Sequence, residues 1–555
     1  PWLTATLVVA AGIMAWRVAQ IIQGPGNISQ TFDDIFHLNA VRYVLDTANG
    51  SSLHIGSMTS PAGTLPFYPA AWHAMVALVV QLTGVAIPVA VNASVVVIAA
   101  VVWPLGIVLL TRTLFGGRAG YTVAAGAVAV AVPAFPILPM DYGVLYPYQL
   151  GLALLPVALA ATLVLLRLVP ERSPRGSWWW LLILMGALPG IALAHPGAFV
   201  AWLALTVPMA IAFVWIRVRD AKTSASRLGV VVGAIAYVAI GAVLVYILRP
   251  PAEARGWPIQ MTIPDALWQV LSVSMWYLIP SALVAVGVIA GIVWAFVDRT
   301  RPALVAVGMY AVGAVLFVAV AALPWTQLRD ALTGSWYNNL PRLASILVIA
   351  IVPLAAYGWG RTWLALVGWG RARSAVAAMP GWARVSAGVV AAALLVVGLQ
   401  GPVIDRAVSW AGAVFRFDPE SPLLSPDEYE LLMRVDTHVP EGVRIAGSPW
   451  TGASLAYAYA DRPVLMPHTL MEMSDELAAI NDGLDTATRG SAACRAVQDL
   501  GVGFVLDFAG REVHPGTHPF RGLDDLAASG AVRLGDSGGD ARLYEITACG
   551  AVRPA

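Results

Sequence analysis

The sequence predicts a polytopic α-helical membrane protein with a soluble α/β domain at its carboxyl end. Of the 555 residues, 59% are hydrophobic and only 12% are charged, whereas charged residues make up about 25% of an ordinary soluble protein. Acidic residues are concentrated at one end, because 21 of the 32 Asp and Glu follow residue 415, against 11 of the 33 Lys and Arg. A mildly acidic soluble domain therefore follows a membrane part, and no nucleic-acid partner is expected.

Eleven apolar segments are expected to cross the bilayer, which takes about 20 helical residues each. They lie near residues 2–22, 89–115, 120–138, 145–169, 179–195, 197–219, 228–249, 275–298, 302–324, 343–360 and 385–402. Arg and Lys cluster in every second connection, as they do in cytoplasmic loops. The intervening connections are therefore expected on the outer face: residues 23–88, 139–144, 195–196, 250–274, 325–342 and everything after about 403. The chain opens at Pro1 rather than at an initiator Met, so further helices upstream stay an open alternative.

One segment of the first outer loop, from Phe67 to Leu82, is apolar enough to resemble a span. It is short for a crossing and carries His73 and Pro69, so we interpret it as an interfacial or re-entrant helix. Counting it as a span would place the start of this loop inside the cell. We assign residues 1–402 to a transmembrane domain with a long outer loop at 23–88, residues 403–424 to a linker, and residues 425–555 to an extracytoplasmic α/β domain of a plasma-membrane protein.

The carboxyl-terminal residues alternate helical and strand patterns. Ser425, followed by Pro426 and two acidic residues, is a strong helix start. Further helices are expected at 453–460 and 492–500, and strands at 443–446, 463–466, 503–506, 532–534 and 542–546. The two cysteines of the chain, Cys494 and Cys549, both fall here. They are expected to form a disulfide if this domain is extracytoplasmic and to stay reduced if it is cytosolic.

Two adjacent carboxylates, Asp33 and Asp34, follow the first span directly. Such a pair is costly in so apolar a chain and asks for a chemical reason. One interpretation is that the acids cap a helix beginning near Ile35. The other is that one is a general base whose neighbour tunes its pKa or positions an acceptor hydroxyl, in a loop that also holds His37 and His54. We favour the second, because a cap needs only one Asp.

Three further residues stand at expected turns. Asp141, in a short outer loop, is either a solvated acid or a second acidic group for a sugar hydroxyl or a metal. His195, at the tight turn with Pro196, is either a polar turn residue or a donor to a phosphate or sugar. Trp450, in a loop of the soluble domain, either packs against the membrane part or binds an acceptor.

The outer segment before the tenth span contains Tyr337, Asn338, Asn339 and Arg342. An Arg at this position is either a surface anchor or a ligand for a lipid phosphate at headgroup depth, which guanidinium binds well in a bidentate manner. The neighbouring aromatic residues suit the membrane interface. We favour phosphate binding, with Arg255 and Arg329 as lesser candidates.

Taken together, these motifs resemble the GT-C superfamily of polyprenyl-phosphate-dependent glycosyltransferases. The resemblance rests on the acidic pair in a long outer loop, the Pro66-Phe67-Tyr68-Pro69 juxtamembrane segment, the short outer loop with Asp141 and the carboxyl-terminal α/β domain. The stretch from Val443 to Met466 is similar in layout to the catalytic subunit of oligosaccharyltransferase but lacks its Trp-Trp-Asp motif, which argues against peptide glycosylation. The sequence of the whole chain resembles an actinobacterial family of multispan proteins related to cell-wall arabinofuranosyl- and mannosyltransferases.

The resemblance implies that a sugar moves, with inversion, from a polyprenyl-phosphate donor in the lipid bilayer to a glycan or glycolipid acceptor. Asp33 would be the general base with Asp34 in support, and Arg342 with His195 would stabilise the departing phosphate. No cofactor is required, and a divalent cation is an option that a monophosphate leaving group does not demand. The competing interpretations are a transporter or flippase of lipid-linked precursors and a non-catalytic envelope-assembly subunit. Arabinofuranose, mannose and galactofuranose all stay open as the sugar.

Overall fold

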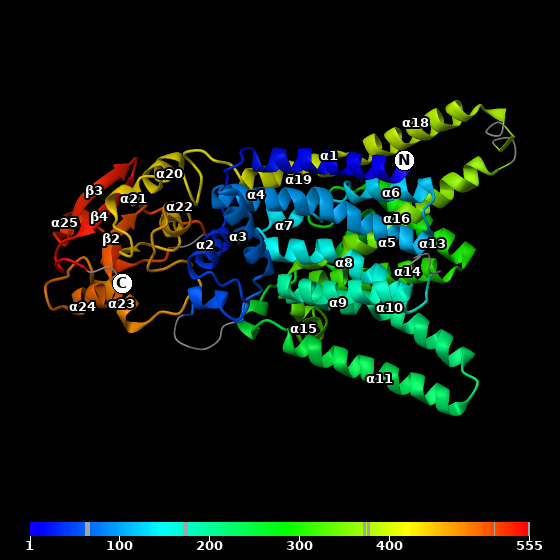
Figure 1. The fold of residues 1–555 in the computed structure, drawn as a ribbon, viewed down its shortest axis with the longest axis horizontal. Helices are drawn as coiled ribbons and strands as arrows, with labels where there is room; N and C mark the ends of the chain where they lie inside the picture. Colours follow the sequence, from blue (N-terminus) through cyan, green and yellow to red (C-terminus); the bar gives the residue numbers. More distant parts are fainter. Residues whose placement is uncertain (61–66, 170–175, 370–372, 375–377, 515–516, 553–555) are drawn as a thin grey trace. The chain divides into compact units, whose positions relative to one another are not determined.

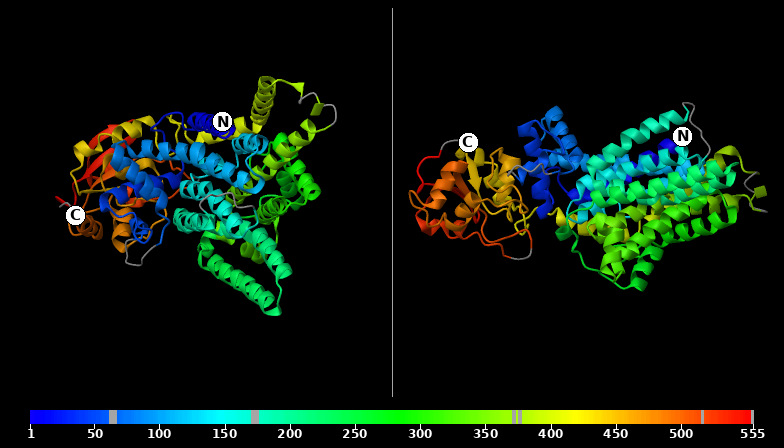
Figure 2. Two further views of the ribbon diagram at one scale, coloured as in Figure 1. Left: turned by 45° about the vertical axis from the view of Figure 1, so that its right-hand side comes forward. Right: turned by 90° about the horizontal axis from the view of Figure 1, so that it is seen from below.

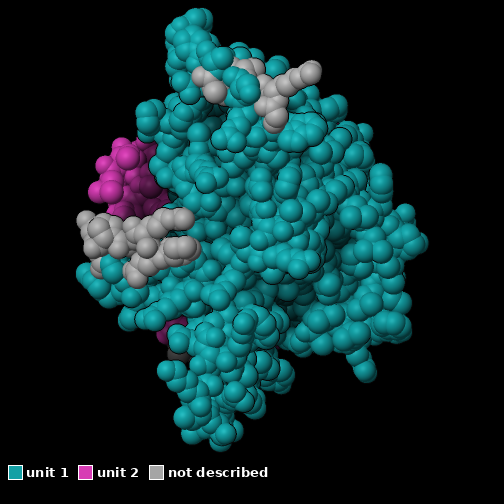
Figure 3. Space-filling view, turned by 90° about the vertical axis from the view of Figure 1, so that its right-hand side faces the viewer, with its two compact units in different colours: residues 1–20, 95–411 teal, residues 21–94, 412–555 magenta. Residues whose placement is uncertain are grey.

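The computed structural model describes the chain apart from residues 61–66, 170–175, 370–372, 375–377, 515–516 and 553–555 (Figure 1). Residue contacts divide the chain into two compact units, which Figure 3 draws in different colours. The helical unit comprises residues 1–20 and 95–411, and the mixed unit comprises residues 21–94 and 412–555. The first outer loop, which we assigned to the transmembrane domain, therefore clusters with the carboxyl-terminal residues.

Nine helical segments of the described residues are long and apolar enough to cross a membrane. They are α1 (Trp2–Ile22), the continuous segment Ile87–Phe115, α8 (Tyr146–Leu165), α9 (Ser177–Ala194), α10 (Pro196–Asp220), α11 (Ser224–Ile247), α14 (Arg301–Ala322), α16 (Leu340–Val367) and α18 (Gly381–Leu399). The second of these is built from α4 (Ile87–Val97), the π-helical turn η2 (Ile98–Val102) and α5 (Trp103–Phe115). The multispan fold class predicted from hydropathy is confirmed.

Two of the eleven expected spans are shorter helices, α6 (Ala119–Ala129) and α13 (Ala282–Asp298). Prolines explain both differences, because a proline lacks the backbone N–H that a helix needs and disfavours helical geometry in the residue before it. Pro133, Pro136 and Pro139 follow α6, and Pro280 precedes α13. The predicted helical stretches 120–138 and 275–298 are therefore too long.

The core of the helical unit is centred on α16, which packs against α5, α6, α13 and α14. Figure 2 shows the long helices of this unit running alongside one another. Close approach depends on small residues, as is usual between membrane helices. A Cβ added at Gly358 of α16 would lie 2.0 Å from the carbonyl oxygen of Gly287 on α13. A side chain at residue 358 would therefore force the two helices apart.

Short elements connect the long helices of the helical unit. They are α7 (Leu138–Asp141), η3 (Ala252–Arg255), α12 (Ile263–Ser272), α15 (Thr326–Thr333), η4 (Gly334–Trp336) and α19 (Pro402–Val414), which continues into the mixed unit. Most of them come from connections that we expect on the outer face. Of the predicted site residues of this unit, Asp141 lies on α7, and Tyr337, Asn338 and Asn339 follow η4.

The mixed unit contains a four-stranded sheet in the order β1-β2-β4-β3. Strands β1 (Arg444–Ala446) and β2 (Val502–Asp507) are parallel, whereas β4 (Ala541–Ile546) is antiparallel to β2 and to β3 (Val532–Gly538). The helices are α20 (Pro426–Leu432), α21 (Val435–His438), η5 (Gly452–Leu455), α22 (Ala456–Ala460), α23 (Asp475–Gly483), α24 (Ala492–Leu500), η6 (Arg521–Leu523) and α25 (Leu526–Ser529). Ser425 caps α20 in a reciprocal capping box with Glu428, so that prediction is confirmed. The predicted strand at 463–466 is wrong, because only a single bridge between Ile445 and Val464 forms there.

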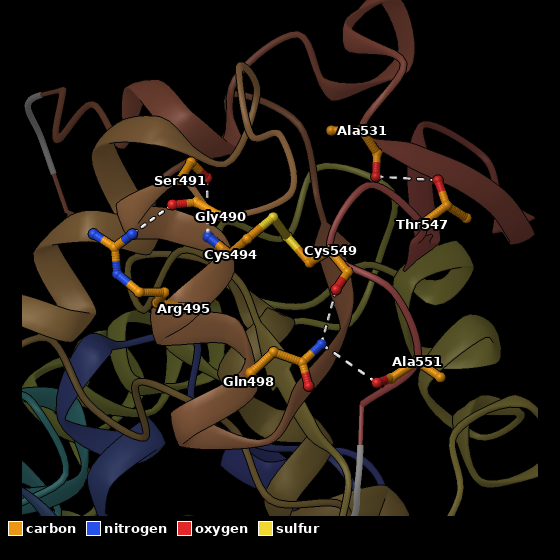
Figure 4. The surroundings of a disulfide bond; sticks show 9 residues. All are labelled: Gly490, Ser491, Cys494, Arg495, Gln498, Ala531, Thr547, Cys549 and Ala551. Atoms are coloured by element: carbon orange, nitrogen blue, oxygen red, sulfur yellow. Dashed lines mark hydrogen bonds between the residues drawn. A yellow bond between two sulfur atoms is a disulfide. The ribbon is translucent and has the colours of Figure 1, made fainter.

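The predicted disulfide joins Cys494 on α24 to Cys549 just after β4 (Figure 4). It closes a sequence separation of 55 residues and ties the last strand to the helix that covers the sheet. Gln498 reinforces the link, because its Nε2 donates to the carbonyl oxygen of Cys549 at 2.9 Å. The segment directly after β4 is therefore fixed to the core of the mixed unit.

The first outer loop contributes α2 (Phe32–Thr47), η1 (Ile55–Met58) and α3 (Ala71–Thr83) to the mixed unit. Helix α3 has 13 residues and is too short to cross a bilayer, in agreement with the interfacial interpretation. Asn39 of α2 attaches the loop to the carboxyl-terminal residues, since its Nδ2 donates to the carbonyl oxygens of Ser454 at 2.9 Å and of Pro467 at 2.8 Å. The loop and the carboxyl-terminal residues thus fold as one body.

Candidate functional site

The acidic pair lies in the first turn of α2 in the mixed unit. Asp33 is half-buried, whereas Asp34 is only 1% exposed. Thr31, at the start of the helix, makes no side-chain cap hydrogen bond. The Oδ2 of Asp34 accepts from the backbone N–H of Ser29 at 3.0 Å, and its Oδ1 has no hydrogen-bond partner. Asp34 is therefore bonded to the loop before the helix rather than to the helix it was suggested to cap.

Burial sets the protonation state of Asp34. Removal from water raises its pKa from 3.8 to about 8, against the opposing effect of the Ser29 N–H, and the neighbouring charge of Asp33 adds to the rise. Asp34 is thus neutral at pH 7. The more exposed Asp33 is the member of the pair placed to act as a carboxylate.

Two histidines, on α2 and α3, are in contact with each other. The Nδ1 of His37 is 3.0 Å from the Nε2 of His73, so one of these nitrogens donates to the other. His73 is completely buried, and burial lowers its pKa to about 3, although a hydrogen bond to the Pro69 backbone opposes the shift. His73 therefore stays neutral, and the pair holds its protons in a fixed hydrogen bond.

A third buried histidine, His468, comes from the carboxyl-terminal residues. Its ring packs edge-on against Phe36, with the centroids 5.4 Å apart, and stacks on Phe32 at 6.3 Å. Burial lowers its pKa to about 4. We refer to Asp33, Asp34, His37, His73 and His468 as the acid–histidine cluster. The three histidines come from segments that are far apart in the sequence and meet around the ring of Phe36, two residues after Asp34.

Trp450 and His54, both predicted from the sequence, take different places in the mixed unit. Trp450 packs edge-on against His514, with the centroids 6.0 Å apart, and His514 in turn packs against Phe32 at 5.6 Å. Trp450 is thereby linked to the start of α2. His54 stacks on Tyr43 farther along α2, with the centroids 5.2 Å apart.

The predicted phosphate ligand, Arg342, lies at the start of α16 in the helical unit. Its Nη1 is 3.0 Å from the Nε2 of His195. Its guanidinium lies over the rings of Tyr337 and Tyr148, at 4.5 and 5.3 Å from their centroids. No ion pair of Arg342 is found among the described residues. We refer to Arg342, His195, Tyr337 and Tyr148 as the arginine cluster.

Both ring nitrogens of His195 face N–H groups. Burial and the charge of Arg342 lower its pKa well below the usual value, so the ring is neutral. A neutral imidazole has one acceptor nitrogen, and the Nδ1 of His195 already accepts from the N–H of Gly197 at 3.0 Å. The Nε2 of His195 faces the Nη1 of Arg342 at 3.0 Å, and a guanidinium can only donate, so the two N–H groups compete for the single acceptor of the neutral ring. A neutral His195 leaves the positive charge of Arg342 uncompensated, which favours an anion beside the guanidinium.

Asn338 and Asn339, which lie between Tyr337 and Arg342 in the sequence, differ in their roles. The side chain of Asn338 is fully engaged, because it donates to the Arg255 carbonyl and to Asp330 and accepts from Thr333. Asn339 donates to the hydroxyl of Tyr142 at 2.9 Å, and its buried Oδ1 has no partner. Asn338 therefore builds the loop, whereas Asn339 retains an unused acceptor.

Asp141 lies among aromatic side chains of the helical unit. Its Oδ2 accepts from the indole Nε1 of Trp276 at 3.3 Å. Burial raises its pKa to about 6, and interactions with the Tyr277 hydroxyl and Trp276 partly offset the rise. Asp141 is therefore not the solvated loop acid of the simpler interpretation.

The two lesser arginine candidates are engaged elsewhere in the helical unit. Arg329 is buried and donates to the backbone carbonyl oxygens of Val320, Trp257, Pro258 and Asn338. Arg255 pairs with Asp330. Both stabilise the loops in which they lie, and of the three candidates Arg342 is the one with aromatic rather than acidic neighbours.

Sequence reasoning did not select His73 and His468 as site residues. His73 was visible as a histidine in an apolar segment, which signals either core packing or function. His468 follows a proline in Met466-Pro467-His468 and carries no local signal of its own. Among the described residues, no group of three or more His, Cys, Asp or Glu side chains has the arrangement of a metal site.

The fold is similar to that of solved membrane glycosyltransferases. ArnT from Cupriavidus metallidurans, in the apo state and bound to undecaprenyl phosphate, gives a TM-score of 0.54 at 12% and 13% identity, over 100% of this chain and 99% of that chain. The archaeal oligosaccharyltransferase AglB from Archaeoglobus fulgidus, in complex with an inhibitory peptide and a dolichol-phosphate, gives 0.50 at 13% identity, over 91% of this chain and 69% of that chain. At such identities the similarity concerns the fold alone.

Similarity in sequence is found at the level of a family. No curated protein matches the chain. A family model described as a family of unknown function, DUF6541, matches residues 1–548, which is nearly the whole sequence. The chain therefore belongs to the DUF6541 family and has an ArnT-like fold.

Proposed function

We propose that this protein is an inverting membrane glycosyltransferase that moves a sugar from a polyprenyl-phosphate donor to a cell-envelope glycan or glycolipid on the outer face of the plasma membrane. The observation that carries the proposal is the contrast within the acidic pair. A half-buried carboxylate, Asp33, stands beside Asp34, which burial keeps protonated. Such a pair suits proton transfer from an acceptor hydroxyl.

In this reaction an acceptor hydroxyl oxygen attacks the anomeric carbon of the donor sugar. The bond from that carbon to the phosphate oxygen breaks, and its electron pair leaves with the polyprenyl phosphate. Asp33 takes the hydroxyl proton as the new bond forms. One direct displacement inverts the anomeric centre. Neutral Asp34 adds no second negative charge beside the base.

The arginine cluster suits the leaving group. Negative charge grows on the phosphate oxygens as the sugar departs, and preorganised donors stabilise that charge most where water is excluded. The guanidinium of Arg342 lies beside a neutral His195, so its positive charge is left for an anion. Tyr337 and Tyr148 hold the guanidinium without neutralising it. The fold similarity to ArnT, which was solved bound to undecaprenyl phosphate, supports this assignment.

The test is sugar transfer by the purified full chain in lipid nanodiscs from a radiolabelled polyprenyl-phosphate sugar, with Asp33→Asn and Asp34→Asn compared. Asp33→Asn removes the base, and the expected loss in kcat is about 10²–10⁴-fold. Asp34→Asn imitates the protonated side chain, and its activity is expected within about tenfold of the wild type.

The two variants check each other, because both replace a carboxyl by an amide of the same shape one residue apart. Full activity of Asp33→Asn would remove this residue as the base. Full activity of both variants would exclude the mechanism. An equally large loss in both, with unchanged folding, would mean that Asp34 takes part as a charged group.

A further inference from the structure

A cavity with a volume of about 520 Å³ and several polar side chains in its walls lies in the helical unit. Its walls come from the loop and helix α12 between residues 260 and 278, from Leu340 at the start of α16 and from Trp410 of α19. This volume is within the range of ligand sites that enclose a small molecule, about 300–1,000 Å³. None of the residues in the arginine cluster lines it.

The side chains around this cavity combine aromatic rings with hydroxyl-binding groups. Three tryptophans, two glutamines, one aspartate and one serine take part: Trp268, Trp276, Trp410, Gln260, Gln269, Asp265 and Ser274. Indole faces cover the apolar C–H face of a sugar ring, whereas amides and carboxylates bond the hydroxyl groups around its edge. An apolar ligand would leave the amides unsatisfied, and an anion would meet Asp265. The lining therefore favours a neutral carbohydrate.

Gln269 gives the cavity an unused hydrogen-bond acceptor. The residue is only 6% exposed, and its Oε1 has no hydrogen-bond partner. A buried polar atom without a partner is costly, at about 1–3 kcal/mol, and usually indicates a missing ligand or water. A sugar hydroxyl is a donor of the required kind.

The loop that lines the cavity has an unusual backbone. Val273, Trp276 and Leu278 have positive φ angles of 51°, 67° and 61°. Bulky and β-branched residues rarely adopt this region, and such strain is concentrated at functional sites. The conformation aims Trp276 at Asp141 while the same residue lines the cavity. Trp276, which forms part of the cavity wall, is therefore hydrogen-bonded to the predicted site residue Asp141.

The rim of the cavity is apolar and exposed. Trp268 is 61% exposed and Leu278 is also 61% exposed, and the neighbouring Leu271 of α12 is 54% exposed. A short amphipathic helix with tryptophan at its exposed face is typical of the membrane interface. A ligand at this position could place its polar part inside the cavity and an acyl chain along the rim.

We propose that the cavity lined by Gln269, Asp265 and Trp276 binds the sugar headgroup of a glycolipid, and that this glycolipid is the acceptor of the proposed transfer. The role of the glycolipid as acceptor rests on the proposed function, whereas glycolipid binding itself is measured without turnover. It narrows the acceptor from any envelope glycan to a sugar that carries a lipid chain.

The experiment measures binding of tritiated octyl mannoside, octyl galactoside and octyl arabinofuranoside, each below its critical micelle concentration, to the full chain in phosphatidylcholine nanodiscs. At least one should bind saturably and should be displaced by its unlabelled form but not by octyltrimethylammonium, which has the chain without the sugar. Gln269→Met keeps the side-chain volume and removes the amide, and it should weaken binding about tenfold or more. Gln327→Met, on the exposed face of α15, is the matched control and should bind as the wild type does.

Each result bears on the inference. Displacement by octyltrimethylammonium, an unchanged affinity in Gln269→Met, or no saturable binding of any of the three glycosides would overturn it. A shared loss in Gln269→Met and Gln327→Met would also overturn it, because the effect would not belong to the cavity. Binding that survives Asp33→Asn while transfer is lost would support both proposals, whereas binding by a protein with no transferase activity would leave only the glycolipid site standing.

Discussion

The acid–histidine cluster and the arginine cluster treat charge in opposite ways. In the mixed unit, burial keeps Asp34 and His73 neutral by raising the pKa of one to about 8 and lowering the pKa of the other to about 3. In the helical unit, Arg342 keeps its charge and is surrounded by aromatic faces instead of a carboxylate. The first arrangement suits the holding and transfer of protons. The second suits the binding of an anion, and the difference indicates that the two units carry separate chemical tasks.

The largest expected effect is confined to the mixed unit. Cys494→Ser together with Cys549→Ser opens a loop of 55 residues, which should lower the free energy of unfolding of this unit by about 4 kcal/mol. Limited proteolysis under native conditions should then cut the carboxyl-terminal residues first. Binding of polyprenyl phosphate should persist, since the arginine cluster lies in the other unit. If the double cysteine variant also lost polyprenyl-phosphate binding, the tasks of the two units would not be separable.

The next effect concerns the arginine cluster. Arg342→Gln should lower kcat/KM for transfer about 100-fold and weaken polyprenyl-phosphate binding, because a donor to the leaving group is lost. The matched control is Arg329→Gln, whose side chain is bonded to backbone carbonyls. That variant should lower the melting temperature instead. A melting defect in Arg342→Gln with normal phosphate binding would contradict the assignment.

The pH dependence of stability tests whether Asp34 is held neutral in the acid–histidine cluster. The pKa of Asp34 is higher in the folded than in the unfolded protein, so the folded state holds the proton more tightly. The contribution of protonated Asp34 to the free energy of unfolding is therefore fully present below pH 4 and is lost as the pH rises toward 8. Between pH 6 and pH 8 the loss should be about 2 kcal/mol. Thermal melting of wild type and Asp34→Asn should diverge over this window, with the variant flatter; parallel curves would show that Asp34 does not titrate there.

The smallest effect tests the attachment of the first outer loop. Asn39→Ala leaves the carbonyl oxygens of Ser454 and Pro467 without their donor and should lower stability by about 1–2 kcal/mol. Hydrogen exchange in α2 should rise, while exchange in α16 should stay as it is. Faster exchange in both helices would mean that the two units unfold together.

Much of the fold could be predicted from the sequence, because hydropathy and proline placement act locally. Long apolar runs identified the spans, and Ser425 and the two cysteines identified the capped helix and the disulfide. The prediction was wrong where a local signal was misread, as at 120–138, where prolines end the helix early. The strand at 463–466 was also predicted from composition alone, whereas a strand needs a partner along its length.

The site is harder to predict than the fold, since its groups meet only in three dimensions. Whether Asn338 serves a ligand or a loop depends on Asp330 and Thr333, and nothing in its own sequence neighbourhood distinguishes the two. His468 becomes a neighbour of Phe36 only after the carboxyl-terminal residues pack on the first outer loop. The residues Asp33, Asp34, Arg342 and His195 were identified because charged or titratable groups are conspicuous in an apolar chain. Their catalytic roles stay predictions.

The hydrogen bonds of Asn39 have a consequence for folding during synthesis on the ribosome. Its partner Ser454 lies 415 residues later in the chain. Ribosomes add about 5–20 residues per second, so roughly 20–80 seconds separate the synthesis of the two. During that interval the first outer loop has no finished partner, and Asp34, His37 and His73 stay open to water. A chaperone that shields nascent loops, or a pause in translation, would act on this protein through that delay.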